Sequence, residues 1–115
     1  MGQLSTHVLD TALGRPAAGL RVTLWALGAD RRHLGTFTTN ADGRTDAPLL
    51  TGDAFRAGVF ELEFAAGAYL RQHHTLANPA FLDVIPVRFG VSDPDAKLHV
   101  PLLLSPYGYS TYRGS

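Results

Sequence analysis

The fold is decided by the stretch Lys97-Leu98-His99-Val100-Pro101-Leu102-Leu103-Leu104. Every second residue in it is apolar, and side chains on a β-strand point alternately to its two faces. The residues that share the predicted core face are Leu98, Val100, Leu102 and Leu104. His99 then points the other way, together with Pro101 and Leu103. The stretch therefore predicts a half-buried strand that carries an imidazole on its outer face.

Segments of the same kind recur along the chain, separated by turn signals such as Asn40-Ala41-Asp42-Gly43. The predicted strands cover residues 5–9, 20–27, 33–39, 59–64, 84–91, 98–104 and 109–112. One short helix is expected over residues 67–75, with Asn78-Pro79 closing the segment. Seven or eight short strands at this spacing predict an all-β sandwich or barrel.

The composition limits what kind of protein this is. The chain has 115 residues, 45% of them hydrophobic, so we expect one globular domain over residues 1–115. Its formal net charge is zero, which argues against nucleic acid or an anionic membrane as partner. It has no cysteine, hence no disulfide and no thiolate site. We see no secretory signal, membrane span or peroxisomal ending, and expect a cytoplasmic protein.

The last residues bear functional groups where chain ends usually carry none. Three aromatic residues alternate with hydroxyl residues before Arg113-Gly114-Ser115. Alternation of aromatic and hydroxyl residues is typical of a strand. Ser110 and Tyr112 would share one face of that strand. The pattern indicates a terminus built into a polar site.

A second histidine has the same placement as His99. In Leu4-Ser5-Thr6-His7-Val8-Leu9, the apolar alternation places His7 on the face opposite Leu4 and Val8. If the three strands are neighbours, the shared outer face carries His7, His99, Ser110 and Tyr112. Two imidazoles and a phenol suit general acid–base chemistry near neutral pH. Two surface histidines with a rim tyrosine explain the same pattern, so both interpretations stand at this point.

Other candidate groups are less specific. Arg44, after the turn Asp42-Gly43, and Arg113 carry guanidinium groups that suit an oxyanion, but each also fits a solvated or ion-paired arginine. The five histidines show no His-x-His or His-x-x-x-His spacing, so a zinc site has little support. No nucleophile elbow or phosphate-binding glycine loop is present.

Several motifs together resemble the 5-hydroxyisourate hydrolases, the enzymatic branch of the transthyretin-like family. The resemblance runs from about residue 4 to the last residue, and the terminal motif is its most specific part. The motifs are Ser5-Thr6-His7-Val8-Leu9-Asp10-Thr11, Gly14-Arg15-Pro16-Ala17, Asp42-Gly43-Arg44, His99-Val100-Pro101-Leu102-Leu103-Leu104-Ser105-Pro106 and Tyr109-Ser110-Thr111-Tyr112-Arg113-Gly114-Ser115.

The resemblance implies a transthyretin-like β-sandwich of two four-stranded sheets with one short helix. It also implies a homotetramer, a dimer of dimers, whose central channel holds the active sites. The implied reaction is hydrolysis of 5-hydroxyisourate, a product of urate oxidation, to 2-oxo-4-hydroxy-4-carboxy-5-ureidoimidazoline, without metal or organic cofactor. Carried over by position, the catalytic residues are His7, Arg44, His99 and Tyr112, and the substrate-binding residues are Ser110, Arg113 and Ser115.

Two positions depart from a simple match. Many members of the family have a second histidine where this chain has Lys97, to which we assign no role. Pro101 cannot donate to a sheet hydrogen bond, so we expect an irregular strand or an unpaired amide side there.

Two other functions are consistent with the predicted strands. A non-catalytic transthyretin-like carrier has the same fold, but carriers of that branch have lysine, glutamate and threonine at the positions of His7, Arg44 and Tyr112. An immunoglobulin-like binding module explains the strands and the neutral charge and leaves the paired histidines unused.

Overall fold

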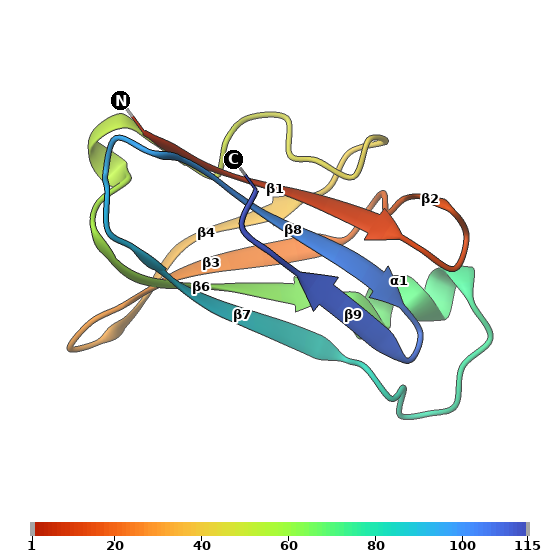
Figure 1. Cartoon of the computed structure of the whole chain (residues 1–115). Coiled ribbons are helices and arrows are strands. Elements are labelled where there is room, and N and C mark those ends of the chain that lie inside the picture. Colours follow the sequence, from red (N-terminus) through yellow and green to blue (C-terminus); the bar gives the residue numbers. More distant parts are fainter. Residues whose placement is uncertain (1, 115) are drawn as a thin grey trace.

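The computed structural model describes residues 2–114, which form two stacked β-sheets and one short helix (Figure 1). The first sheet contains, in spatial order, β2 (Arg15–Pro16), β1 (Gln3–Asp10), β8 (Lys97–Ser105) and β9 (Gly108–Thr111), while β5 (Leu50–Thr51) also pairs with β1. The second sheet contains β4 (Arg31–Thr38), β3 (Arg21–Leu27), β6 (Gly58–Ala65) and β7 (Val84–Val91). A 3-10 turn, η1 (Gly52–Ala54), follows β5, and the helix α1 (Ala66–His73) follows β6. The predicted all-β sandwich is confirmed.

The first sheet has five strands where the sequence predicted four. The additional strands, β2 and β5, are two residues long and pair antiparallel with opposite ends of β1. A two-residue strand has no alternation to detect, which is why the sequence did not reveal them. The helix also ends earlier than predicted. His74 is extended, and its amide donates to the Leu70 carbonyl at 2.8 Å. The helix α1 therefore ends at His73 and not at residue 75.

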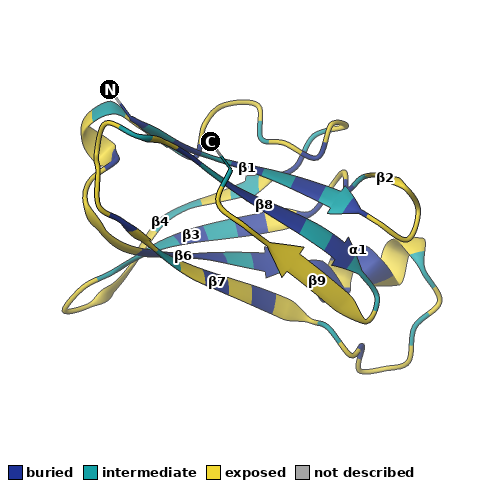
Figure 2. Cartoon of the chain, in the orientation of Figure 1, coloured by how far each residue is buried: buried dark blue, intermediate teal, exposed yellow. Residues whose placement is uncertain are grey.

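Burial follows the alternation that the sequence predicted. Inward-facing residues of β1 and β8 are buried, and their outward neighbours are mostly half-buried (Figure 2). Leu4, Val8, Leu102 and Leu104 are fully buried in the core between the sheets. Complete burial of such a side chain contributes about 1.5–3 kcal/mol. A one-residue slip of either strand would bring these groups to the surface, so the core fixes the register.

β1 and β8 pair in parallel although most of the chain separates them. Ser5 lies opposite His99, and His7 lies opposite Pro101. Residues directly opposite one another in a sheet have their side chains on the same face. The pairing therefore brings both predicted histidines to the outer face of the first sheet.

Within residues 2–114, β7 pairs only with β6, and β9 pairs only with β8. Each of these two strands thus leaves one edge of its sheet unpaired, and Figure 1 shows β7 and β9 along the same side of the sandwich. Unpaired edges are places where another chain can add strands. No helix of the described residues is long and apolar enough to cross a membrane.

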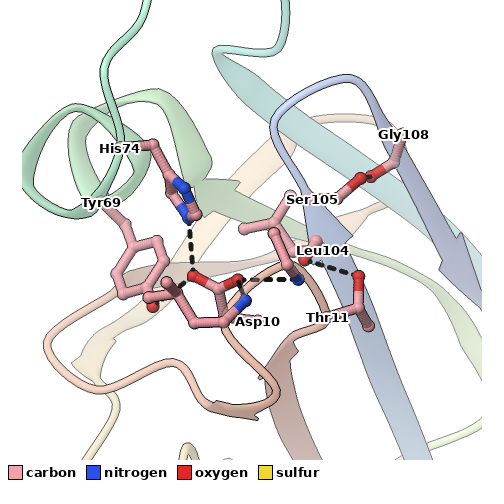
Figure 3. Close-up of polar contacts among 9 residues, drawn as sticks. Asp10, Thr11, Tyr69, His74, Leu104, Ser105 and Gly108 are labelled. Atoms are coloured by element: carbon pink, nitrogen blue, oxygen red, sulfur yellow. Dashed lines mark hydrogen bonds and ion pairs between the residues drawn. The ribbon is translucent and has the colours of Figure 1, made fainter.

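A buried carboxylate joins the end of β1 to the helix. Asp10 is fully buried, and its Oδ2 accepts hydrogen bonds from the Tyr69 hydroxyl at 2.8 Å and from His74 Nε2 at 2.9 Å (Figure 3). Its Oδ1 accepts from the amides of Ala12 and Leu13. Burial by itself raises the pKa of Asp10, but these hydrogen bonds outweigh burial and hold the pKa below its usual value.

We expect Asp10→Asn to lower the free energy of unfolding at pH 7 by about 2 kcal/mol, because it removes charge-assisted hydrogen bonds. The lowered pKa of Asp10 stabilises the fold above the unfolded value of about 3.9, and this contribution is lost as the pH falls through the folded value. Urea unfolding between about pH 2 and 7 should therefore show that the free energy of unfolding falls less with decreasing pH in Asp10→Asn than in the unsubstituted protein. The exposed Asp53→Asn serves as control. Equal acid profiles for the Asp10 variant and the unsubstituted protein would contradict this account.

Candidate active site

Arg44, His7 and Pro101 form a row across the outer face of the first sheet. An antiparallel bridge joins Arg44 to His7 on the side of β1 that faces away from β8, between the β5 and β2 pairings, and His7 lies opposite Pro101 on β8. Arg44 is more than thirty residues from His7 in the sequence. The edge of β1 therefore brings the predicted arginine beside the predicted histidine.

A tight turn of the chain, residues 40–44, holds Arg44 in this place. The Asn40 side-chain oxygen accepts from the amides of Asp42 and Arg44, at 2.9 and 3.2 Å. Gly43 has φ of 75°, a conformation that favours glycine. A Cβ there would lie 2.2 Å from the Val8 carbonyl oxygen, so only glycine permits the turn to approach β1.

His7 has a fixed hydrogen-bond partner in the same turn. Its Nε2 lies 2.8 Å from the Asp42 carbonyl oxygen. A carbonyl oxygen only accepts, so His7 must donate from Nε2, and in the neutral ring the lone pair is on Nδ1. The contact determines the tautomer of His7 and gives the ring one free basic nitrogen.

His99 lies in the neighbouring row, between Ser5 and Gly114. Its Nδ1 is 2.9 Å from the Ser5 hydroxyl, and its carbonyl accepts from the Gly114 amide at 2.8 Å. A Cβ on residue 114 would lie 2.8 Å from His99 Cδ2, so glycine leaves the space that the imidazole occupies. Burial, then the charge of Arg44, then His7 lower the pKa of His99. The ring is therefore biased toward its neutral form.

The two imidazole rings are neighbours on this face. Their centroids are 6.5 Å apart, and the ring planes are inclined by 38°. This separation is too large for a direct hydrogen bond between the rings. Beside Arg44, such a pair can move a proton and stabilise a developing negative charge.

Tyr112 and Ser110 belong to the same outer face. The β8–β9 pairing has the same offset at Leu102–Thr111 and at His99–Gly114, which sets Tyr112 opposite Pro101. Ser110 lies opposite Leu103. Both residues are exposed, Tyr112 to 58%, so in the single chain this part of the face is open to solvent.

Pro101 explains the interruption just before Tyr112. Its missing amide hydrogen falls on the β9 side of β8, where regular pairing ends at Thr111. The Thr111 hydroxyl donates to the Pro101 carbonyl at 2.8 Å. Of the two expected alternatives, the unpaired amide side is the one present, because β8 itself continues regularly through Pro101, and it coincides with the position of the predicted tyrosine.

The remaining predicted residues are placed differently. Arg113 lines cavities near the β7 edge together with Gly90 and Leu98, away from the two imidazoles. Ser115 lies outside the described residues. A cavity of about 640 Å³ lies elsewhere, between the β3–β4 turn and the segment after η1, and none of the predicted residues lines it. In residues 2–114, no three histidine, aspartate or glutamate side chains are grouped to hold a metal ion.

Three groups that contact the histidines have no individual role predicted from the sequence. Ser5 has the same strand parity as His7, but only the β1–β8 register reveals that it contacts His99. The Asp42 contact is made by a backbone carbonyl, which leaves no signal in the sequence. Gly114 was recognised as part of the terminal motif, and the structure adds the reason that glycine is required there.

The HIUase/Transthyretin family profile matches residues 4–114. The chain belongs to this family. It is 63% identical to the 5-hydroxyisourate hydrolase of Mesorhizobium japonicum over 116 residues, covering 99% of this chain and 93% of that relative. It is 60% identical to 5-hydroxyisourate hydrolase 2 of Rhizobium meliloti, covering 99% of this chain and 97% of that relative.

Solved structures agree with this assignment. The structure of (S)-allantoin synthase matches 99% of this chain with a TM-score of 0.94 and 44% identity, and the match covers 44% of that longer chain. The 5-hydroxyisourate hydrolase of Klebsiella pneumoniae matches over the full length of both chains, with a TM-score of 0.82 and 34% identity. Sea bream transthyretin in complex with thyroxine matches with a TM-score of 0.85 and 30% identity, and the match covers 97% of this chain and 94% of that one. The predicted transthyretin-like fold is confirmed.

We expect Arg44→Gln to raise the pKa of His99, because it removes a positive charge that disfavours the imidazolium. NMR titration of the His99 ring would measure the change. Arg113→Gln is the matched control, since Arg113 lies on the other side of the strand, and it should leave the His99 titration unchanged. A His99 pKa that stays constant or falls in Arg44→Gln would show that Arg44 does not act on this ring.

Proposed function

We propose that this chain hydrolyses 5-hydroxyisourate in urate degradation, using His7, Arg44, His99 and Tyr112 on the outer face of the first sheet. The comparisons bear out the predicted activity, since relatives that bear this name are up to 63% identical over nearly the whole chain. The observation that carries the residue assignment is the pair of imidazoles 6.5 Å apart, beside a guanidinium. The individual roles below follow from their hydrogen-bond partners and charges.

The first step is attack of water on a ring carbonyl of the substrate. His7 takes the proton of this water on Nδ1, because the Asp42 carbonyl keeps the hydrogen on Nε2. A carbon–oxygen bond forms, and the carbonyl oxygen becomes an oxyanion.

The second step is opening of the ring at the amide C–N bond. Arg44 stabilises the oxyanion, and Tyr112 and Ser110 supply hydroxyl donors from the opposite side of the face. As the oxyanion collapses, the C–N bond breaks, and the departing ring nitrogen receives the proton held by His7. His99 stays neutral and orients the water or the substrate by a hydrogen bond. Arg113 and Ser115 remain predicted substrate-binding residues.

A transthyretin-like carrier is the alternative within the same fold. The likeness to sea bream transthyretin does not distinguish the two, because one fold serves several functions. The paired imidazoles with Arg44 are acid–base groups that binding alone would not require. Tight binding of a hormone-like ligand without hydrolysis would favour the carrier.

We also propose that the enzyme is a homotetramer, a dimer of dimers, formed by single-domain chains in the cytoplasm. The unpaired edges of β7 and β9 lie on one side of the sandwich and can extend both sheets in a symmetric dimer. The outer face of the first sheet carries Leu9 and Leu103 beside the histidines. Packing two such faces together would enclose a site that is open in the single chain.

Turnover of 5-hydroxyisourate, generated in place from urate and urate oxidase, tests the function. The ultraviolet absorbance of the substrate should decay much faster with the protein than without it. His7→Asn and His99→Asn should each lower turnover by about 10²–10⁴-fold, the usual contribution of acid–base catalysis. His33→Asn, on the exposed edge strand of the other sheet, is the matched control and should be unaffected. No acceleration of the decay would refute the proposed function, and full activity of both active-site variants would refute the residue assignment.

Leu103→Glu should separate the proposed tetramer into smaller species, because it places a charge on the packed outer face. Light scattering after size exclusion would measure the mass. Val59→Glu, at a 43% exposed position in the second sheet, should keep the mass of the unsubstituted protein. A single-chain mass for the unsubstituted protein, or an unchanged tetramer in Leu103→Glu, would contradict the proposed assembly.

A further inference from the structure

Ser5 makes a side-chain contact that the proposed mechanism has not used. Its hydroxyl lies 2.9 Å from Nδ1 of His99, in a half-buried position. The contact joins two strands, because Ser5 and His99 are directly opposite in the parallel β1–β8 pairing. Ser5 lies two residues before His7 on the same face of β1. One strand thus carries His7 and the hydroxyl partner of His99.

The partners of the two histidines differ chemically. His7 faces a carbonyl oxygen, which can only accept a hydrogen bond. His99 faces a hydroxyl, which rotates and can either donate or accept. The Ser5 hydroxyl can therefore donate to a bare Nδ1, which leaves the hydrogen on Nε2. It can also accept from a protonated Nδ1, which leaves Nε2 bare in the neutral ring.

We propose that Ser5 is a positioning residue, whose hydroxyl holds the His99 ring and keeps a hydrogen bond to Nδ1 in each tautomer of that ring. His99 Nε2 then serves as donor or acceptor toward the water and the substrate without the ring having to turn. This inference rests on the proposed function. It adds a residue that contacts His99 and not the substrate.

Other groups around His99 leave this role to Ser5. The charged or titratable groups that act on it are His7 from β1 and Arg44 from the turn. Lys97 and Tyr112 lie on the same face of the sheet. Gly114 packs on the ring and offers no side-chain donor or acceptor. Of the side chains within the described residues, the hydroxyl of Ser5 is the one that hydrogen-bonds a His99 ring nitrogen.

The test compares Ser5→Ala with Ser5→Thr, which restores a hydroxyl, and with Ser105→Ala. Ser105 is the matched control because it lies on the same face of β8, and its hydroxyl donates to the Gly108 carbonyl, away from His99. Backbone pairing of β1 and β8 does not depend on the Ser5 side chain, so the variants should fold. Two readouts are needed: the pH dependence of kcat and KM, and ¹⁵N NMR shifts of the two His99 ring nitrogens, which report the tautomer.

Ser5→Ala should lower kcat by about tenfold, a fraction of the 10²–10⁴ that acid–base catalysis contributes, with KM nearly unchanged. It should also displace the limb of the kcat–pH profile that His99 controls, and change the Nδ1 and Nε2 shifts. Ser5→Thr should recover most of the kcat and most of the original nitrogen shifts, and Ser105→Ala should match the unsubstituted protein. Unchanged His99 nitrogen shifts in Ser5→Ala would overturn the inference. The same kcat in Ser5→Ala and Ser105→Ala would overturn it too. The NMR readout needs no substrate, so it separates this failure from failure of the proposed function.

Discussion

The parallel pairing of β1 with β8 is the constraint on which the site depends. It sets Ser5 beside His99 and places His7 two residues further along the same face. The core enforces this register, because Leu4, Val8, Leu102 and Leu104 must stay buried while their neighbours face outward. The same alternation that stabilises the sandwich thus determines where the imidazoles lie.

The surroundings of the two histidines give them different properties. The carbonyl beside His7 fixes its hydrogen on Nε2 and leaves Nδ1 as the basic nitrogen, which suits a base. Burial and Arg44 disfavour the cation on His99, which suits a neutral hydrogen-bonding group. A tight glycine turn at Gly43 and a close approach at Gly114 make these arrangements possible. Backbone geometry is therefore part of what positions the reactive side chains.

Strand parity and motifs predicted the sandwich and the shared face of His7, His99, Ser110 and Tyr112. The structure brings Arg44 to this face as well, while Arg113 lies nearer the β7 edge. The two-residue strands and the Asp10 cluster escaped prediction, because neither leaves a periodic pattern. Partners such as the Asp42 carbonyl and the Ser5 hydroxyl depend on register and on turn geometry, which parity along one strand does not specify.

The proposed mechanism requires the two imidazoles to act together on one water and one substrate. A double-mutant cycle measures this directly, using kcat/KM of His7→Asn, His99→Asn and the double variant. Groups that act on the same step lose their separate contributions once one is removed. We predict that the double variant is little slower than the slower single variant. Losses that multiply in the double variant would show that the histidines act independently and would contradict the account.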